Sequence, residues 1–373
     1  MLNEELIGVE GGRAKLQTPA LVVDLDALEK NIAAMAAHAK AKNIALRPHA
    51  KTHKCAEIAR RQIAAGAAGI CVAKLGEAEA MADAGIDSIL ITSPVVSDGG
   101  IARLMALNAR MGELMVVCDN DEVAKRLADA AKASGKKLKI LIDIDPGLGR
   151  TGIRPGDNAV ALVEQVAKSG SLEYAGLQCY AGQVQHMESP NERRDASLTA
   201  LKELGSLRDQ LAARRLAPKI LSGGGTGTFD IDPDARVLTE LQVGSYVFMD
   251  RQYNDVWTKP GARPPFVTSL FVQTTVISAN RDNLVTTDAG FKSFATDAGS
   301  PEIASGAGAN YFFFGDEQGG IFYSGEQKLR VRDSILCVVP HCDPTVNLYD
   351  RIHAVRGDRL EAIWTIEARG RSA

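Results

Sequence analysis

Short, nearly continuous runs of apolar residues recur along the first two thirds of the chain, and a stretch of helical composition follows most of them. Eight runs are expected to be strands: 44–48, 69–73, 88–92, 114–118, 138–143, 176–179, 219–222 and 238–243. Runs such as LMVVC and IDSILIT are apolar on both faces, as a parallel sheet covered by helices requires. Eight repeats of this kind predict a closed (β/α)₈ TIM-type barrel rather than an open sheet.

The pattern of the sequence changes near residue 260, where PGARPPF ends the alternation of strands and helices. Closely spaced short runs follow without a convincing helix between them, and one of them covers 345–348. These runs predict a C-terminal antiparallel β domain. The early segment ALVVDLD (20–26) fits either that domain or the edge of the barrel. We therefore expect a barrel over 27–260 and a β domain made of 1–26 together with 261–373.

Composition excludes several classes of function. The chain has 43 Lys and Arg against 46 Asp and Glu, a net charge of −3, so no basic field favours nucleic acid or an anionic membrane. Its apolar runs are far shorter than the roughly 20 residues of a membrane span. The first residues resemble neither a secretory signal nor a transit peptide, so we expect a cytoplasmic protein. Six widely separated cysteines without a CxxC pair argue against disulfides and a structural zinc site.

In such a barrel the working residues lie at the carboxyl ends of the strands. The first strand ends in RPHAKTHK (47–54), a basic cluster placed ahead of a helix. Positive charge at a helix N-terminus opposes the macrodipole, so stability alone does not explain it. A lysine at the barrel mouth can have its amine pKa lowered by neighbouring cations and can then form a Schiff base with a carbonyl.

Two further strand ends carry side chains with either a structural or a functional interpretation. Arg150 follows the fifth strand in the loop DPGLGRTG, as a surface residue of a turn or as a guanidinium that holds a phenolate or carboxylate. Tyr180 and His186 follow the sixth strand. They gain weight only from their position at this end of the barrel.

Glycine-rich turns follow the last two strands. SGGGTGT (222–228) ends the seventh strand, and Gly244-Ser245 comes directly after the eighth. Such loops let backbone N–H groups converge on an anion, and phosphate sites of this barrel often use these two loops. The sequence therefore predicts a phosphate cradle, although a tight structural turn is the simpler alternative. The pattern is not that of a Walker-type nucleotide site.

The β domain contains the motif PHCDPTVNLYD. If His341-Cys342-Asp343 is extended, His341 and Asp343 lie on one face and Cys342 on the other. An imidazole and a carboxylate on one face can hold a divalent metal weakly. A hydrogen-bonded pair without metal is the alternative, and the sequence alone favours it.

A Schiff-base lysine and a phosphate cradle on one barrel are the two devices that pyridoxal phosphate needs. The motifs TPALVVDLDALEKNI, RPHAKTHK, GLGRTG, SGGGTGT and PHCDPTVNLYD together resemble the alanine-racemase-like, fold type III pyridoxal-phosphate enzymes. Within that group the chain looks most like the metal-activated D-threonine aldolases, which are relatives of the D-serine dehydratases. The resemblance covers about residues 18–350.

The resemblance assigns cofactor roles to matching residues: Lys51 as the Schiff-base lysine, Arg150 at the phenolic oxygen, Tyr180 beside the ring, and Gly225, Thr226, Gly244 and Ser245 at the phosphate. It implies a divalent metal on His341 and Asp343, with Mn²⁺ preferred and Mg²⁺, Co²⁺ or Zn²⁺ as alternatives. His186 would lie near that metal, able to remove the proton of the β-hydroxyl.

The implied reaction is the cleavage of D-threonine and other D-β-hydroxy-α-amino acids to glycine and an aldehyde. Related dehydratases are expected to show His-x-Cys, so Asp343 favours the aldolase unless a bulge changes the register. The alternatives are a dehydratase acting on D-serine or D-threo-3-hydroxyaspartate and a non-catalytic carrier of the cofactor. A racemase would leave His341 and Asp343 unexplained. By analogy we expect a homodimer.

Overall fold

The computed structural model describes residues 2–257, 265–304, 308–324 and 328–373. Two compact units make up the chain, and each is described by itself. The barrel unit comprises Met35–Lys51, Ile58–Gly244 and Arg371–Ala373, and the β unit comprises Met1–Ala34, Thr52–Glu57 and Ser245–Gly370. The expected domain boundary at residue 260 stays a prediction.

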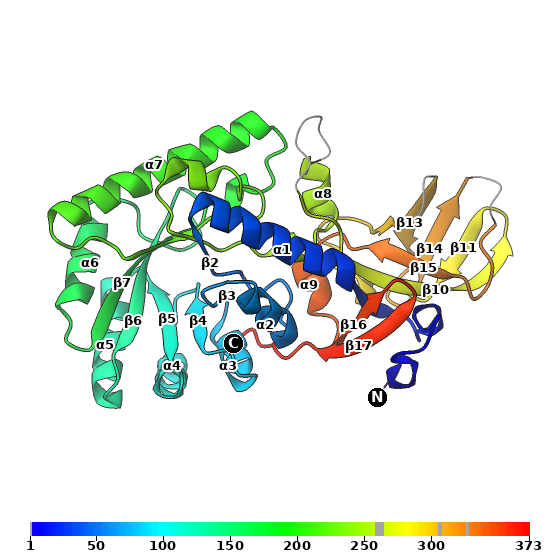
Figure 1. Ribbon diagram of the computed structural model, residues 1–373, viewed down its shortest axis with the longest axis horizontal. Helices are drawn as coiled ribbons and strands as arrows, with labels where there is room; N and C mark the ends of the chain where they lie inside the picture. The colour runs from blue at the N-terminus through cyan, green and yellow to red at the C-terminus, as the bar shows by residue number, and fades with distance from the viewer. Residues whose placement is uncertain (1, 258–264, 305–307, 325–327) are drawn as a thin grey trace. The chain divides into compact units, whose positions relative to one another are not determined.

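The barrel unit contains a parallel sheet of eight strands in the order β2-β9-β8-β7-β6-β5-β4-β3 (Figure 1). The strands are β2 (Ala45–Leu46), β3 (Ile70–Val72), β4 (Ser88–Ile91), β5 (Glu113–Cys118), β6 (Leu138–Ile144), β7 (Leu172–Cys179), β8 (Ile220–Gly223) and β9 (Glu240–Leu241). The two ends of this order also meet, because a parallel bridge joins His49, just after β2, to Cys71 in β3. The predicted eight-stranded barrel is therefore confirmed.

Helices alternate with these strands, as predicted. They are α1 (Leu25–Lys42), α2 (Ala56–Ala64), α3 (Leu75–Asp83), α4 (Asp98–Arg110), α5 (Asp121–Ser134), α6 (Asp157–Lys168) and α7 (Pro190–Ala213). The Asn120 side chain accepts hydrogen bonds from two amides in the first turn of α5, and Gly135 ends that helix with a φ of 73°. Ser189 caps α7, which starts with Pro190.

The barrel interior combines an apolar layer with a buried ion pair. Cys71, Leu90, Met115, Val117, Leu141 and Ala175 form one apolar cluster. Arg47 is buried and forms an ion pair with the buried Glu240, with 3.0 Å between Nε and Oε2. Its Nη1 also donates to the hydroxyl of Ser88 at 2.8 Å. Because a buried charge needs such partners, Arg47 is a structural residue of the interior rather than part of a basic surface.

The β unit is built on a mixed sheet in the order β13-β14-β11-β10-β1-β16-β17, with β15 joining β10 to β12. The strands are β1 (Ala20–Asp24), β10 (Leu270–Arg281), β11 (Leu284–Thr287), β12 (Glu302–Ile303), β13 (Ala309–Phe313), β14 (Gly319–Tyr323), β15 (Ser334–Val338), β16 (Arg351–Arg356) and β17 (Arg359–Thr365). The pairs are antiparallel except β1 with β16, which is parallel. The segment 20–26 thus contributes its strand to this sheet, one of the two alternatives left open by the sequence.

The described part of the β unit also contains two helices after the barrel strands, and the second of them lies beyond residue 260, where the sequence predicted no helix. They are α8 (Arg251–Trp257) and α9 (Cys342–Val346). The strand expected over 345–348 is therefore wrong. Its residues belong to the end of α9 and the turn after it, where the amide of Leu348 donates to the carbonyl of Thr345.

All six cysteines are free and buried. In the part of the chain that the structure describes, no helix is long and apolar enough to cross a membrane.

Candidate active site

The barrel brings the candidate cofactor residues to neighbouring strand ends. The strands β6, β7, β8, β9 and β2 are consecutive in the sheet. The residues that follow them are, in the same order, Arg150, Tyr180, Gly225 with Thr226, Gly244, and Lys51. Because parallel strands end at one edge, these segments share the carboxyl-end mouth of the barrel. Ser245 follows Gly244 directly and is the first residue of a short 3₁₀ turn, Ser245–Val247, in the β unit.

The backbone around Lys51 is fixed by both neighbouring strands. The amide of His49 donates to the carbonyl of Val243 at 2.9 Å, and the amide of Ala50 donates to the carbonyl of Cys71 at 2.7 Å. Lys51 is the next residue, and its side chain is partly exposed. The lysine therefore stands at the mouth between β9 and β3.

The other basic residues of the sequence RPHAKTHK are buried, which corrects the prediction of one basic cluster. His49 bonds the hydroxyl of Thr92 at 3.0 Å. In the β unit, the amide of Cys55 donates to Nδ1 of His53 at 3.1 Å, and the amine of Lys54 donates to the carbonyl of Ala368 at 3.5 Å. The cluster is thus a set of separately bonded side chains, and Lys51 differs from them by its exposure.

The loop that carries Arg150 is held by three carboxylates. Asp145 accepts the amides of Gly147 (2.9 Å) and Gly149 (3.0 Å). On the other side of Arg150, the hydroxyl of Thr151 donates to Asp143 (2.8 Å), and the amide of Gly152 donates to Asp119 (2.8 Å). These bonds fix the position of the Arg150 loop although it contains three glycines.

Arg150 and Tyr180 contact each other across neighbouring strands. The guanidinium carbon lies 5.4 Å from the centroid of the Tyr180 ring, within the range of a cation–π interaction. Arg150 is exposed and Tyr180 is partly buried. His186 is exposed on the segment after β7, and the residue before it, Gln185, is buried. The sequence singled out His186 but gave no reason to notice Gln185.

The glycine-rich loop after β8 is buried. Thr226 is 2% exposed, and Gly224 has a φ of 73°, which favours glycine. A Cβ added at Gly225 would lie 2.4 Å from Oε1 of Gln185, so a larger residue here would displace the Gln185 side chain. No α-helix begins directly behind the loop, where the chain instead enters the 3₁₀ turn Asp232–Ala235. An anion here would therefore depend on backbone amides and hydroxyls without the dipole of a following α-helix.

In the β unit, His341 and Asp343 are not on one extended strand. His341 is extended and stands just before α9, whereas Asp343 is in the first turn of that helix. The amide of the buried Cys342 donates to the buried carboxylate of Asp250 at 2.8 Å, and the hydroxyl of Thr345 donates to the carbonyl of His341 at 2.7 Å. These bonds start the helix, so the period-2 argument for a shared face is wrong.

His341 has a partner that the sequence did not reveal. Its Nδ1 lies 2.7 Å from Oδ2 of Asp297, and the imidazole is 28% exposed. A carboxylate on one ring nitrogen orients the other, which is the usual outer partner of a metal-bound histidine. Among the described residues, no three His, Cys, Asp or Glu side chains form a group able to hold a metal. Any ion here would rest on few protein ligands.

Comparison with known proteins shows the family to which the chain belongs. Residues 23–252 match the family model of the alanine racemase N-terminal domain, and residues 269–355 match a model described as a serine dehydratase domain. A D-threonine aldolase from an Arthrobacter species is 39% identical over 359 residues, 96% of this chain and 94% of that protein. The chain belongs to the alanine-racemase-like family.

Other relatives of this alanine-racemase-like protein include further aldolases. A 3-hydroxy-D-aspartate aldolase from Paracoccus denitrificans is 35% identical over 365 residues, 96% of this chain and 93% of that protein. The crystal structure of a D-threonine aldolase from Filomicrobium marinum superposes with a TM-score of 0.92 at 39% identity, covering 96% of this chain and 97% of that one. The resemblance found in the sequence is confirmed, and the family implies pyridoxal phosphate as cofactor.

The raised pKa of Asp143, at the carboxyl end of β6, makes the stability of the protein depend on pH. Burial raises that pKa to about 6, although hydrogen bonds from Gln178 and Thr151 lower it. Between about pH 4 and pH 6 the folded protein therefore holds a proton that the unfolded chain has lost. The contribution of Asp143 to the free energy of unfolding is therefore complete below the pKa of an unfolded aspartate. It is lost as the pH rises through about 6.

We expect the unfolding free energy of the wild type to fall relative to that of Asp143→Asn by up to about 3 kcal/mol between pH 4 and pH 7. Chemical denaturation of both proteins across that range measures the difference. The exposed Asp129→Asn in α5 is the matched control for loss of a solvated carboxylate. A difference that stays constant with pH would contradict the buried, proton-holding Asp143.

Proposed function

We propose that this protein is an aldolase that uses pyridoxal phosphate and a divalent metal to cleave D-threonine and other D-β-hydroxy-α-amino acids to glycine and an aldehyde. The main support is the position of Lys51 at the mouth of the barrel. The neighbouring strand ends there supply Arg150, Tyr180 and a buried glycine-rich loop. The identities of 39% and 35% to two aldolases, each over 96% of this chain, support the same bond cleavage.

The residues at the barrel mouth fit the cofactor. We assign Lys51 as the amine that forms the Schiff base, and Gly225, Thr226, Gly244 and Ser245 as phosphate donors. When bound, pyridoxal phosphate stores the electron pair that remains on Cα after the Cα–Cβ bond breaks. Holding the phosphate and the amine at separate points fixes the orientation of the ring.

Arg150 and Tyr180 form the side of the proposed cofactor site. We assign the Arg150 guanidinium to the phenolic oxygen of the cofactor ring. Its cation–π contact with Tyr180 keeps Arg150 and Tyr180 together on this side of the site. The bonds from Thr151 and Gly152 to buried or partly buried carboxylates hold the arginine loop in place. Arg150 therefore acts as an orienting cation rather than as a proton donor, since guanidinium does not lose its proton in proteins.

We assign a divalent cation to two side chains of the β unit, His341 and Asp343. Asp297 on Nδ1 of His341 presents Nε2 as the ligand atom, and Asp343 supplies a carboxylate oxygen. A nitrogen and an oxygen donor are compatible with Mn²⁺, which we propose first, and with Mg²⁺, Co²⁺ and Zn²⁺ as alternatives. Such an ion would polarise the substrate's β-hydroxyl. We assign His186 to take the proton from that hydroxyl.

A dehydratase is the second candidate because a D-threo-3-hydroxyaspartate dehydratase from a Delftia species is 30% identical over 63% of this chain. Its solved structure, at 24% identity and a TM-score of 0.83, shows the shared fold alone. We also propose that the protein is cytoplasmic and forms a homodimer. Size-exclusion chromatography with light scattering tests the homodimer.

Product analysis separates the candidates. We expect the purified enzyme with pyridoxal phosphate and Mn²⁺ to convert D-threonine to glycine and acetaldehyde in equal amounts, and 3-hydroxy-D-aspartate to glycine and glyoxylate. Chromatography of derivatised amino acids and aldehydes measures both, with L-threonine as the control. Ammonia with a 2-oxo acid would indicate the dehydratase, and no turnover of any of these substrates would favour a carrier.

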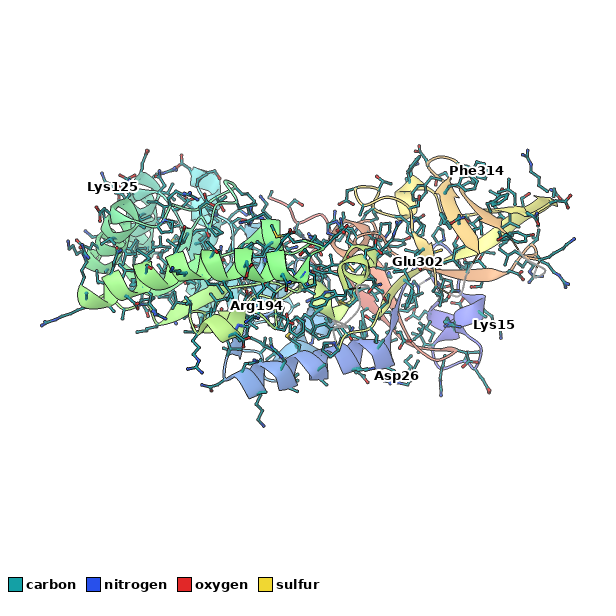
Figure 2. All side chains as sticks on the ribbon, turned by 90° about the horizontal axis from the view of Figure 1, so that it is seen from above. Lys15, Asp26, Lys125, Arg194, Glu302 and Phe314 are labelled. Atoms are coloured by element: carbon teal, nitrogen blue, oxygen red, sulfur yellow. The ribbon has the colours of Figure 1, made fainter. Side chains whose placement is uncertain are left out.

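Lys51→Ala removes the only group to which we assign covalent attachment. We expect loss of the visible absorption band of the lysine-bound cofactor and a fall in kcat of about a thousandfold or more. Absorption spectroscopy and the aldehyde assay give these readouts. Lys125→Ala, on the exposed face of α5 (Figure 2), is the matched control. A retained band in Lys51→Ala would disprove the assignment.

The metal assignment makes a separate prediction. Exhaustive chelation and His341→Ala should each stop turnover while the cofactor band stays, because His341 is assigned to the metal and not to the cofactor. Asp297→Asn should weaken Mn²⁺ activation about 10- to 100-fold, since the imidazole loses its orienting carboxylate. Titration of the chelated enzyme with Mn²⁺ measures this, with the exposed Asp316→Asn as control. Full activity after chelation would overturn the assignment.

A further inference from the structure

A buried hydrogen-bond network supports the glycine-rich loop from behind. Its side chains are Gln185, Ser197, Thr228 and Asp232, which are exposed by 1%, 3%, 0% and 2%. They come from three places in the barrel unit: the segment after β7, helix α7, and the glycine-rich loop with the turn that follows it. Arg194, which is labelled in Figure 2, marks helix α7 and precedes Ser197 by three residues.

The amide of Gln185 is oriented by three partners. Its Oε1 accepts the backbone N–H of Gly227 at 2.9 Å. Its Nε2 donates to the hydroxyl of Thr228 at 3.1 Å and to the carbonyl of Ala181 at 3.3 Å. Only an amide has an acceptor on one side and two donors on the other, so glutamine is the side chain that satisfies all three.

The network continues through Thr228 to a buried carboxyl group. The Thr228 hydroxyl accepts from Gln185 and donates to Oδ2 of Asp232 at 2.6 Å. The hydroxyl of Ser197 donates to Oδ1 of the same residue at 2.5 Å. Asp232 thus connects the loop to α7, and the direction of each bond follows from the donors and acceptors present.

The loop also packs directly on Gln185. A Cβ at Gly227 would lie 2.0 Å from the carbonyl oxygen of Gln185, and one at Gly225 would lie 2.4 Å from its Oε1. The N–H of Gly227 is bonded to Gln185, and the N–H of Thr228 donates to the carbonyl of Gly225 at 3.2 Å. The second half of the loop therefore has a structural task, and anion binding is assigned to Gly225 and Thr226.

We propose that Gln185 is a positioning residue that shapes the phosphate-binding half of the glycine-rich loop and joins it to the segment carrying Tyr180 and His186. This inference rests on the proposed function, because it takes the anion at the loop to be the cofactor's phosphate. Gln185 immediately precedes His186, and its bond to Ala181 lies next to Tyr180. One side chain therefore sets the spacing between the phosphate loop and the segment assigned to the ring and the proton.

The variant Gln185→Glu tests the inference because it keeps the shape and removes the two donors. A carboxylate would face the Ala181 carbonyl and Thr228 without N–H groups and would leave buried acceptors unsatisfied. We expect the affinity of the enzyme for pyridoxal phosphate to fall about 10- to 100-fold. The affinity for pyridoxal, which lacks the phosphate, should stay within about twofold. Absorbance titration of the cofactor-depleted full chain with each compound measures both constants.

The matched control is Gln165→Glu, because the Nε2 of Gln165 donates to the carbonyl of Asp121 on an exposed part of α6 at 2.8 Å. It should bind both compounds as the wild type does. If Gln185→Glu does not fold, the pair Thr228→Val and Thr228→Ser replaces it, with the preference for pyridoxal phosphate lowered in the first and retained in the second.

The outcomes separate the two levels of the proposal. A wild type that prefers pyridoxal phosphate over pyridoxal, with that preference reduced in Gln185→Glu, supports the positioning role. An unchanged preference, or an equal loss of affinity for both compounds, overturns it and leaves the proposed function intact. A wild type that does not distinguish the two compounds contradicts the phosphate loop itself, and with it the proposed function.

Discussion

The closure of the barrel at β2 is the constraint on which the site depends. This strand is only two residues long, yet the backbone after it bonds to Val243 on one side and to Cys71 on the other. Without these bonds the first and last strands would part, and Lys51 would have no fixed place beside Gly244. The buried ion pair between Arg47 and Glu240 joins the same two strands from the interior.

Buried carboxyl groups then hold the loops that the strands carry. Asp143, with its pKa raised by burial to about 6, binds the Arg150 loop through Thr151, and Asp232, with its pKa raised by burial to about 7, binds the glycine-rich loop through Thr228. Burying an acid is unfavourable unless it is hydrogen-bonded. These loops therefore gain defined positions at an expense in stability, which is typical of functional sites.

Much of the barrel could be predicted from the sequence because strands buried on both faces are continuous apolar runs, and the loops between them show as glycines. Local patterns failed where distant partners decide. The segment after His341 was expected to be extended but is a helix, and Asp250 accepts the amide of its first residue, Cys342. Nothing near His341 in the sequence indicates Asp297, 44 residues away. Gln185 was missed for the same reason, since its meaning comes from Gly227 and Thr228.

We assign the covalent attachment of the cofactor to Lys51 alone, at the mouth of the barrel. Reduction of the intact holoenzyme with borohydride, followed by digestion and mass spectrometry of the peptides, locates the attachment point directly. We expect one pyridoxyl-phosphate group per chain, on the peptide containing Lys51 and on that residue's amine. A label on Lys54 or Lys74, or on no lysine at all, would contradict it.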